Sequence, residues 1–298
     1  MLYQWIIASR PWTFTAAFTP IALGTSLAIS DGYHFDLFLF ILALLGGIFL
    51  QAGANFLNTY GDYMSGVDTI DSAITCPQIV TGILPAYKMK YVGIGMLTIA
   101  IIIGLFLTFL CGWPVFAFGF IGFLGAASYT TGWFPYKYKG LGPIFVFFLM
   151  GPFMVLPAYY IQTYLLNINI FFVSIPIAFL VTAIMHANDL RDIEYDNTSG
   201  IKTIALWLGF KYSLLLYKVI CIMAFVVLVC LVALRILPTV ALLPLVLFPL
   251  LIRKFKRIKY PNITVEIKNL VKWTAGFHFL FGLFFIIGIL LSPFVHIE

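Results

Sequence analysis

The sequence predicts an all-α integral membrane protein, a single polytopic domain over residues 1–298. Only 9% of the residues are charged and 62% are hydrophobic, which is too little charge for the surface of a soluble globular domain. The mean hydropathy of +1.06 agrees with this. Apolar stretches long enough to cross a hydrocarbon core of about 30 Å also recur along the chain. A helical membrane bundle is therefore the expected fold.

The N-terminal residues 2–7 are expected to form a short interfacial helix, with Trp5 and Trp12 as anchors at the lipid headgroups. Pro20, in the first span, is tolerated because neighbouring helices can satisfy the carbonyl group that it frees. In chain order, nine spans are predicted: 12–30, 37–58, 91–111, 114–133, 142–163, 168–189, 211–234, 236–254 and 273–292.

Basic residues are concentrated on one side of this arrangement. The connections 59–90, 134–141, 190–210 and 255–272 hold or border nearly all of them, whereas the opposite connections hold only Arg235. By the positive-inside rule, the basic loops and the N-terminus face the cytoplasm and the C-terminus faces outward, in the inner cell membrane. No cleavable signal peptide is evident. The net charge of +6 is thus a consequence of topology, and nucleic-acid binding is not expected.

Acidic residues are rare and clustered. Of eleven in the chain, seven fall into two groups that follow the second and sixth spans, both on the predicted cytoplasmic side. Such close carboxylates repel each other unless a cation lies between them, and ionisable groups near a membrane indicate function. The groups are Asp62, Asp68 and Asp71, and then Asp189, Asp192, Glu194 and Asp196.

Helical spacing selects which of these side chains can act together. Side chains three or four residues apart share a helix face, and two sets result: Asn55, Asn58 and Asp62, and Asn188, Asp192 and Asp196. Asp189 lies near the second face, whereas Glu194 points away. Oxygen-only ligand sets with few carboxylates suit Mg²⁺. His186, the nearest histidine, points away from the ligand face, which argues against zinc.

Two Mg²⁺ patches with Arg and Lys side chains nearby favour a diphosphate ligand. Cations neutralise the charge that develops on a leaving diphosphate and so promote cleavage of its C–O bond. A diphosphate on a long apolar tail also explains the membrane spans, since the tail can lie in the bilayer. Aromatic side chains, among them 31 Phe, can exclude water and stabilise an allylic cation.

Two motifs carry a resemblance to a known family. The stretch from Asn58 to Asp71 resembles the first aspartate-rich motif of the UbiA superfamily of membrane prenyltransferases, and Asn188 to Asp196 resembles the second. The segments 8–24 and 129–142 resemble the first helix and the middle cytoplasmic loop of the family. Within the superfamily, the spacing from Asp62 to Asp68 and the Arg191–Asp192 pair look most like the 1,4-dihydroxy-2-naphthoate polyprenyltransferases of the menaquinone branch.

The resemblance implies a bundle around a central cavity, capped by cytoplasmic loops, that transfers a polyprenyl group from its diphosphate to an aromatic ring. It further implies two Mg²⁺ ions, and loss of CO₂ from the attacked ring carbon in the menaquinone branch. Asp62, Asp68, Asp192 and Asp196 would be catalytic. Asn58, Asp62 and Asp68 would hold one ion, and Asn188, Asp192 and Asp196 the other. Tyr129, Lys137, Arg191 and Lys202 would contact the diphosphate, and Arg10 would help to bind the aromatic acid.

Some positions depart from the family pattern. Thr59 and Pro143 stand where acidic residues are common, Asp189 stands where Asn is common, and a usual basic residue after Asp71 is missing. Other readings remain: an acceptor such as 4-hydroxybenzoate, a quinone-binding protein without turnover, or a cation transporter. A transport pathway would place ionisable groups near the midplane, unlike these clusters.

Overall fold

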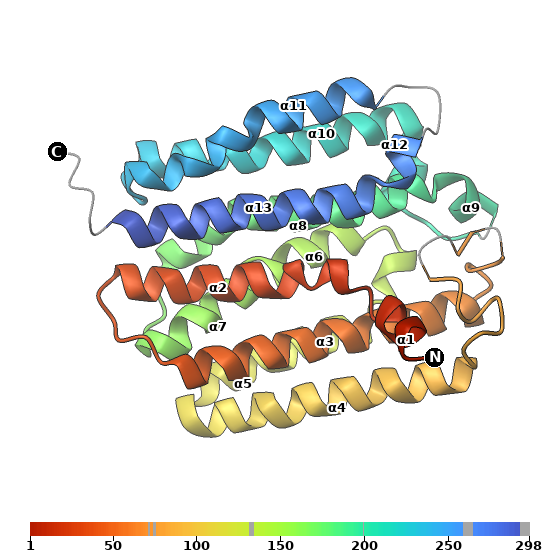
Figure 1. Cartoon of the computed structure of the whole chain (residues 1–298), viewed down its shortest axis with the longest axis horizontal. Helices are drawn as coiled ribbons and strands as arrows, with labels where there is room; N and C mark the ends of the chain where they lie inside the picture. The colour runs from red at the N-terminus through yellow and green to blue at the C-terminus, as the bar shows by residue number, and fades with distance from the viewer. Residues whose placement is uncertain (71, 74–75, 131–133, 199, 259–264, 293–298) are drawn as a thin grey trace.

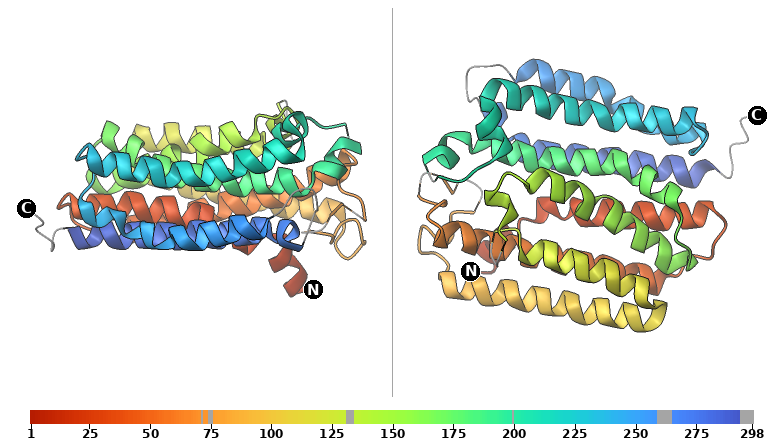
Figure 2. Two further views of the ribbon diagram at one scale, coloured as in Figure 1. Left: turned by 90° about the horizontal axis from the view of Figure 1, so that it is seen from above. Right: turned by 180° about the vertical axis from the view of Figure 1, so that it is seen from behind.

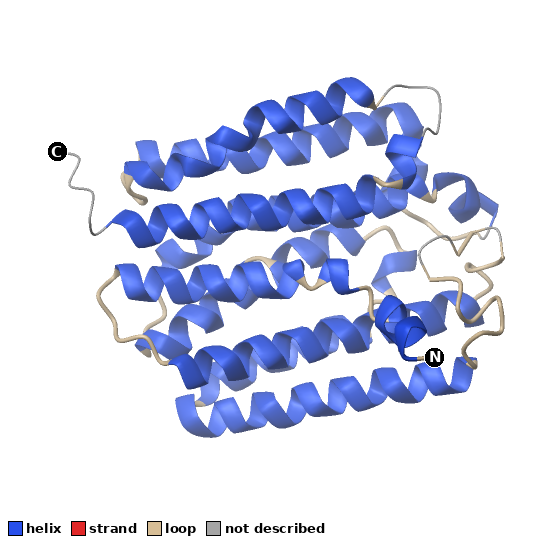
Figure 3. Ribbon diagram, in the orientation of Figure 1, coloured by secondary structure: helices blue, strands red, loops and turns tan. Residues whose placement is uncertain are grey.

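The structure is a computed structural model that describes all residues except 71, 74–75, 131–133, 199, 259–264 and 293–298. Every regular element in the described part is helical, and an isolated backbone bridge joins Lys139 to Lys202 (Figure 3). The long helices lie side by side along a common direction, while α1 projects from the bundle (Figures 1 and 2).

The helical elements follow one another with short connections. In chain order they are α1 (Leu2–Ala8), η1 (Pro11–Thr13), α2 (Thr15–Ser30), α3 (Leu37–Met64), α4 (Ala86–Cys111), α5 (Trp113–Ala127), η2 (Tyr136–Tyr138), α6 (Gly142–Met150), α7 (Pro152–Thr163), α8 (Ile168–Arg191), α9 (Ile193–Thr198), α10 (Ile204–Ala233), η3 (Thr239–Leu247), α11 (Phe248–Arg257), α12 (Val265–Lys268) and α13 (Leu270–Leu291).

The multi-pass character predicted from the sequence is confirmed. In the described part, six helical segments are long and apolar enough to cross a membrane: α3, α4, α6 with α7, α8, α10 and α13. The pair formed by Leu2–Thr13 and Thr15–Ser30, bent by 48°, gives a seventh if it is one span. Helix α5 is shorter, and residues 239–257 combine a 3₁₀ segment with a short helix. The number nine therefore stays a prediction.

Two helices extend past their predicted spans, and this determines where the acidic residues lie. Helix α3 continues to Met64, so Asp62 belongs to its last turns and not to a loop. Helix α8 continues to Arg191, and Asp192 is its C-cap. Polar residues continue both helices because helix ends outside the hydrocarbon core no longer require apolar side chains.

Small residues let the helices approach closely, as is usual in membrane bundles. A side chain at Gly24 in α2 would meet the backbone of α7, with its Cβ 2.9 Å from the nitrogen of Tyr159. Gly282 in α13 likewise faces Thr19 in α2. Helix α2 is thereby held between α7 and α13 in the interior of the bundle.

The segments that hold the two acidic clusters gather at one end of the bundle. The loop after α3, the η2 segment, α9 and α12 all lie at this end, as does α1, whereas α13 ends at the opposite end (Figure 1). This arrangement places both predicted clusters on one side. Which side of a membrane that end faces stays a prediction.

Candidate functional site

A small polar pocket lies where the ends of α3 and α8 come together. All six predicted metal ligands line it, as do three of the predicted substrate contacts. Its lining residues are Arg10, Asn58, Asp62, Val67, Asp68, Ser72, Ala73, Cys76, Lys137, Asn188, Arg191, Asp192, Tyr195 and Asp196. Residues separated by more than a hundred positions in the sequence therefore surround one space.

Asp62 is the best-connected carboxylate of the first motif. Lys137 Nζ donates to its Oδ2 at 2.6 Å, and Asn58 Nδ2 donates to the same oxygen at 2.7 Å. Tyr138 donates its hydroxyl to Oδ1 at 2.7 Å. Burial lowers the pKa of Lys137, but the adjacent carboxylate of Asp62 outweighs burial, so that the net shift is upward. The Asp62 carboxylate therefore favours the charged form of the buried Lys137 side chain.

Arg10 connects the N-terminal segment to the first motif. It adopts a left-handed backbone conformation (φ 54°) between α1 and α2. Its Nη1 donates to Asn58 Oδ1 at 3.1 Å, and its Nη2 donates to Thr59 Oγ1 at 3.0 Å. Thr59, where the family often has an acidic residue, thus holds the guanidinium through a hydroxyl. The sequence did not reveal this contact or that of Tyr138, because both depend on tertiary packing.

The second motif is organised by Arg191. Its Nε donates to Asp192 Oδ1 at 2.6 Å, and its Nη2 donates to Asp192 Oδ2 at 2.5 Å. The same Nη2 donates to Asn188 Oδ1 at 3.0 Å, and Asn188 Nδ2 donates to Asp192 Oδ2 at 3.2 Å. Each motif therefore has the same composition: an amide, a carboxylate four residues later and a cation paired to that carboxylate.

Two further carboxylates, those of Asp68 and Asp196, line the pocket without an ion pair to any described lysine or arginine, and their pKa values are raised. Burial, followed by repulsion from Asp62, raises the pKa of Asp68 to about 6. Burial raises the pKa of Asp196 to about 7, with Asp192 adding to the shift and Lys137 opposing it. Negative charge in this pocket is thus unfavourable, and a bound cation would relieve the repulsion.

The donor set fits Mg²⁺. Each motif offers carboxylate and amide oxygens, and Mg²⁺ commonly takes one or two carboxylates and completes its shell with waters and substrate phosphates. In the described part of the chain, no three His, Cys, Asp or Glu side chains converge to hold a metal by themselves. His186 Nε2 instead lies 3.0 Å from the backbone oxygen of Ser213, away from the pocket. The ligand chemistry therefore does not match zinc.

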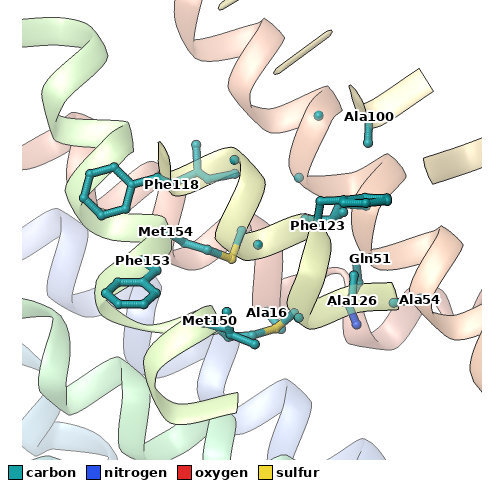
Figure 4. A pocket seen from close by; sticks show the side chains of 18 of the residues that line it. Ala16, Gln51, Ala54, Ala100, Phe118, Phe123, Ala126, Met150, Phe153 and Met154 are labelled. Carbon is teal, nitrogen blue, oxygen red and sulfur yellow. The ribbon is translucent and has the colours of Figure 1, made fainter. Parts of the chain in front are cut away.

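A much larger apolar cavity adjoins the polar pocket. Its volume is about 560 Å³, and residues of α2 to α8 form most of its wall. Phe118, Phe123, Phe153, Met150 and Met154 surround it (Figure 4). The two cavities share three wall residues: Arg10, Asn58 and Asn188. An elongated ligand could therefore place a charged end at the motifs and an apolar end among aromatic side chains.

Several predicted residues lie elsewhere. Tyr129 lines the apolar cavity, and its ring centroid is 5.8 Å from Lys137 Nζ. Lys202 is exposed and lines neither cavity; its backbone nitrogen donates to the Tyr138 oxygen at 3.2 Å. Glu194 is exposed, as expected for a residue that points away. Asp189 is buried but also lines neither cavity. Asp71 lies outside the described residues.

The sequence is similar to those of known proteins. The model of the UbiA prenyltransferase family matches residues 17–280. UbiA prenyltransferase domain-containing protein 1 of Homo sapiens is 30% identical over 296 residues, covering 97% of this chain and 84% of that protein. The 1,4-dihydroxy-2-naphthoate octaprenyltransferase of Bacillus subtilis is 35% identical over 203 residues, covering 68% of this chain and 65% of that enzyme.

A solved structure shows the same fold. A UbiA homologue from Archaeoglobus fulgidus, bound to GPP and Mg²⁺, aligns with a TM-score of 0.63 at 17% sequence identity. The alignment covers 98% of this chain and 100% of that chain.

Proposed function

Since the chain belongs to the UbiA prenyltransferase family, we propose that it transfers a polyprenyl group from an allylic diphosphate to 1,4-dihydroxy-2-naphthoate, with loss of CO₂. One observation carries this proposal. A charged pocket with two amide–carboxylate motifs shares a wall with an apolar cavity of about 560 Å³. The first suits a diphosphate and the second suits its hydrocarbon tail and an aromatic ring.

The chain's own residues bind and neutralise the diphosphate. Lys137, Arg191 and Arg10 are buried or half-buried cations on the pocket wall, where low dielectric strengthens their attraction for a phosphate oxygen. Asn58, Asp62 and Asp68 would hold one Mg²⁺, and Asn188, Asp192 and Asp196 a second. The ions, when bound, supply positive charge that stabilises the leaving diphosphate.

The reaction balances without a redox partner. The C–O bond between the allylic carbon and the diphosphate breaks, and the electron pair leaves with the diphosphate. A new C–C bond forms between the allylic carbon and the ring carbon that bears the carboxylate. The carboxylate leaves as CO₂, and its bonding electrons restore the aromatic ring. Aromatic side chains such as Tyr129 and Phe123 exclude water, which would otherwise capture the allylic cation.

The acceptor is the more specific part of the proposal. The Bacillus subtilis relative named for this acceptor is 35% identical over 68% of the chain. This supports 1,4-dihydroxy-2-naphthoate over 4-hydroxybenzoate, the alternative. We place the polar pocket at the cytoplasmic face of the inner membrane, on the basis of the basic loops that surround it.

The test is turnover by purified protein in detergent or vesicles. With a polyprenyl diphosphate, Mg²⁺ and each aromatic acid in turn, mass spectrometry should detect a prenylated, decarboxylated naphthoquinol and released diphosphate. Chelation should stop the reaction and Mg²⁺ should restore it. Turnover that continues in excess chelator would refute the metal assignment, and prenylation of 4-hydroxybenzoate alone would refute the acceptor.

A further inference from the structure

A strip of polar side chains runs along one wall of the otherwise apolar cavity. Arg10, Thr13, Gln51, Asn55 and Asn58 all line the cavity, among Ala, Gly, Leu, Met and Phe residues. Of the three strip residues on α3, Gln51 lies furthest from Asp62 in sequence, and Figure 4 shows its side chain beside Ala54 and Ala126. Burying an amide group in an apolar wall is unfavourable in free energy unless the group forms hydrogen bonds, so the partners of each amide matter.

The hydrogen bonds around Thr13 define the orientation of the Gln51 amide. Thr13 donates its hydroxyl to the backbone oxygen of Arg10 at 2.8 Å. Having used its proton, Thr13 Oγ1 can only accept, and it accepts from Asn55 Nδ2 at 2.9 Å and from Gln51 Nε2 at 3.4 Å. The carbonyl oxygen of Gln51 is therefore directed elsewhere.

Two buried atoms of this strip have no hydrogen-bond partner among the described residues: Gln51 Oε1 and Arg10 Nε. One is an acceptor and the other is a donor. Both residues line the same cavity, and Arg10 also lines the polar pocket. A buried polar atom without a partner is unfavourable unless a ligand satisfies it.

We infer that Gln51 recognises the acceptor substrate, with its Oε1 accepting a hydrogen bond from a ring hydroxyl while Arg10 Nε donates to the carboxylate. This rests on the proposed function, because both atoms are assigned to the aromatic acid. The pair is complementary to a ligand with one hydroxyl donor and one carboxylate acceptor. A prenyl tail has neither group, and a diphosphate has no hydroxyl donor when ionised, so neither part of the donor substrate satisfies Gln51.

The strip also explains how the ring is positioned. Gln51, Asn55 and Asn58 lie on α3 at successive helical turns, and Asn58 borders the polar pocket. An acceptor held at Gln51 and Arg10 therefore lies at the junction of the two cavities, next to the diphosphate end of the donor. Gln51 is a specificity residue that contacts substrate, and no bond breaks or forms on it.

The test measures discrimination between hydroxyl and ether. The kcat/KM of the wild-type enzyme for 1,4-dihydroxy-2-naphthoate should be about tenfold or more above its kcat/KM for at least one of the two monomethyl ethers. The ether has no proton to donate, so Gln51 Oε1 stays buried without a hydrogen bond. In Gln51→Met, which keeps the side-chain length without the acceptor, the difference should fall to about twofold or less. The KM for the polyprenyl diphosphate should not change.

Two variants and a second apolar substitution complete the experiment. Gln51→Glu keeps an accepting oxygen and should retain the preference for the hydroxyl over the ether, while the lost donor to Thr13 and the added charge lower kcat/KM for both acceptors. Thr182→Val is the matched control, because the buried Thr182 hydroxyl donates to the oxygen of Ala178 in its own helix and lines neither cavity. It should behave as wild type. Gln51→Leu replaces Gln51→Met if the latter does not insert.

The outcomes separate the two proposals. Unchanged discrimination in Gln51→Met or Gln51→Leu, or no discrimination in a wild-type enzyme that turns over, overturns the role of Gln51 and leaves the prenyltransferase assignment standing. A wild-type protein that prenylates no hydroxylated aromatic acid overturns the proposed function, and the role of Gln51 with it. Loss of discrimination with an unchanged donor KM supports the inference.

Discussion

Replacing Lys137 with Met should destabilise the protein, and Mg²⁺ should restore part of the lost stability. The Lys137 Nζ and Asp62 Oδ2 atoms are 2.6 Å apart, and both side chains are under 10% exposed, at 8% and 5%. Removing one partner of such a buried pair leaves an uncompensated charge and costs about 3–5 kcal/mol. Asn58 and Tyr138 still donate hydrogen bonds to Asp62, so the loss of stability should lie near the lower end of this range, at about 3 kcal/mol.

The assay is thermal unfolding of the purified protein in detergent, followed by circular dichroism with and without Mg²⁺. A loss of 3 kcal/mol corresponds to a decrease in apparent Tm on the order of 5–10 °C for a chain of this size. Mg²⁺ should reverse part of this decrease, because a cation at Asp62 replaces the lost charge. Lys139→Met is the control: Lys139 is exposed, lies over the Phe134 ring and has no carboxylate contact in the described part of the chain.

A double-mutant cycle makes the reasoning refutable. Asp62→Asn removes the charge that Lys137 neutralises, so Lys137→Met combined with Asp62→Asn should be more stable than the sum of the single effects predicts, by about 1–3 kcal/mol. If Lys137→Met melts at the wild-type temperature without Mg²⁺, or if the two substitutions are additive, the buried pair is not what holds this end of the bundle together.

Three further predictions concern the motifs and the helix packing. Asp62→Asn and Asp192→Asn should each lower kcat by about 100-fold or more while the protein still inserts, measured as product formation per folded protein. Each change removes a carboxylate that would hold the Mg²⁺ opposing the negative charge on the leaving diphosphate. Glu194→Gln, on an exposed side chain, should keep turnover within about twofold of wild type; an inactive variant would contradict its assignment outside the site. Gly24→Ala should lower stability by about 1–3 kcal/mol because its Cβ would press on the backbone of α7, whereas Gly95→Ala, which meets nothing within 4 Å, should be neutral or stabilising in the same melting assay.

The membrane-spanning helices could be predicted from the sequence. Apolar length alone predicts a multi-pass helical chain, because a helix in lipid must satisfy its backbone internally and present apolar side chains. The ends of the helices were less predictable. Polar residues such as Asn58 and Asp62 continue α3 without an apolar signal, so the predicted span stopped at residue 58 although the helix extends to Met64.

The residues of the candidate site were partly predictable from the sequence, but the hydrogen bonds and ion pairs between them were not. Spacing along one helix placed Asn58 with Asp62, and the hydrogen bond between them agrees with that. Spacing cannot tell which loop residue reaches the helix. Both Lys137 and Lys202 were predicted to contact the diphosphate from loops on the same side of the membrane. In the structure Lys137 is buried against Asp62, whereas Lys202 is exposed. The difference arises from the path of η2, which no local pattern specifies.

The clustered acids are partly neutralised by Lys137 and Arg191, and this makes the binding of a metal ion and the binding of a diphosphate depend on each other. Lys137 forms an ion pair with Asp62, and Arg191 forms one with Asp192. Both carboxylates are ones that a metal ion would also use. Asp68 and Asp196 have raised pKa values and are left for an additional cation. A cation that enters must therefore share Asp62 and Asp192 with a lysine and an arginine, which is favourable only when further negative charge arrives with it. A diphosphate supplies that charge. Strong metal binding is thus expected to require the diphosphate, and diphosphate binding to require the metal, which equilibrium binding of each with and without the other would measure.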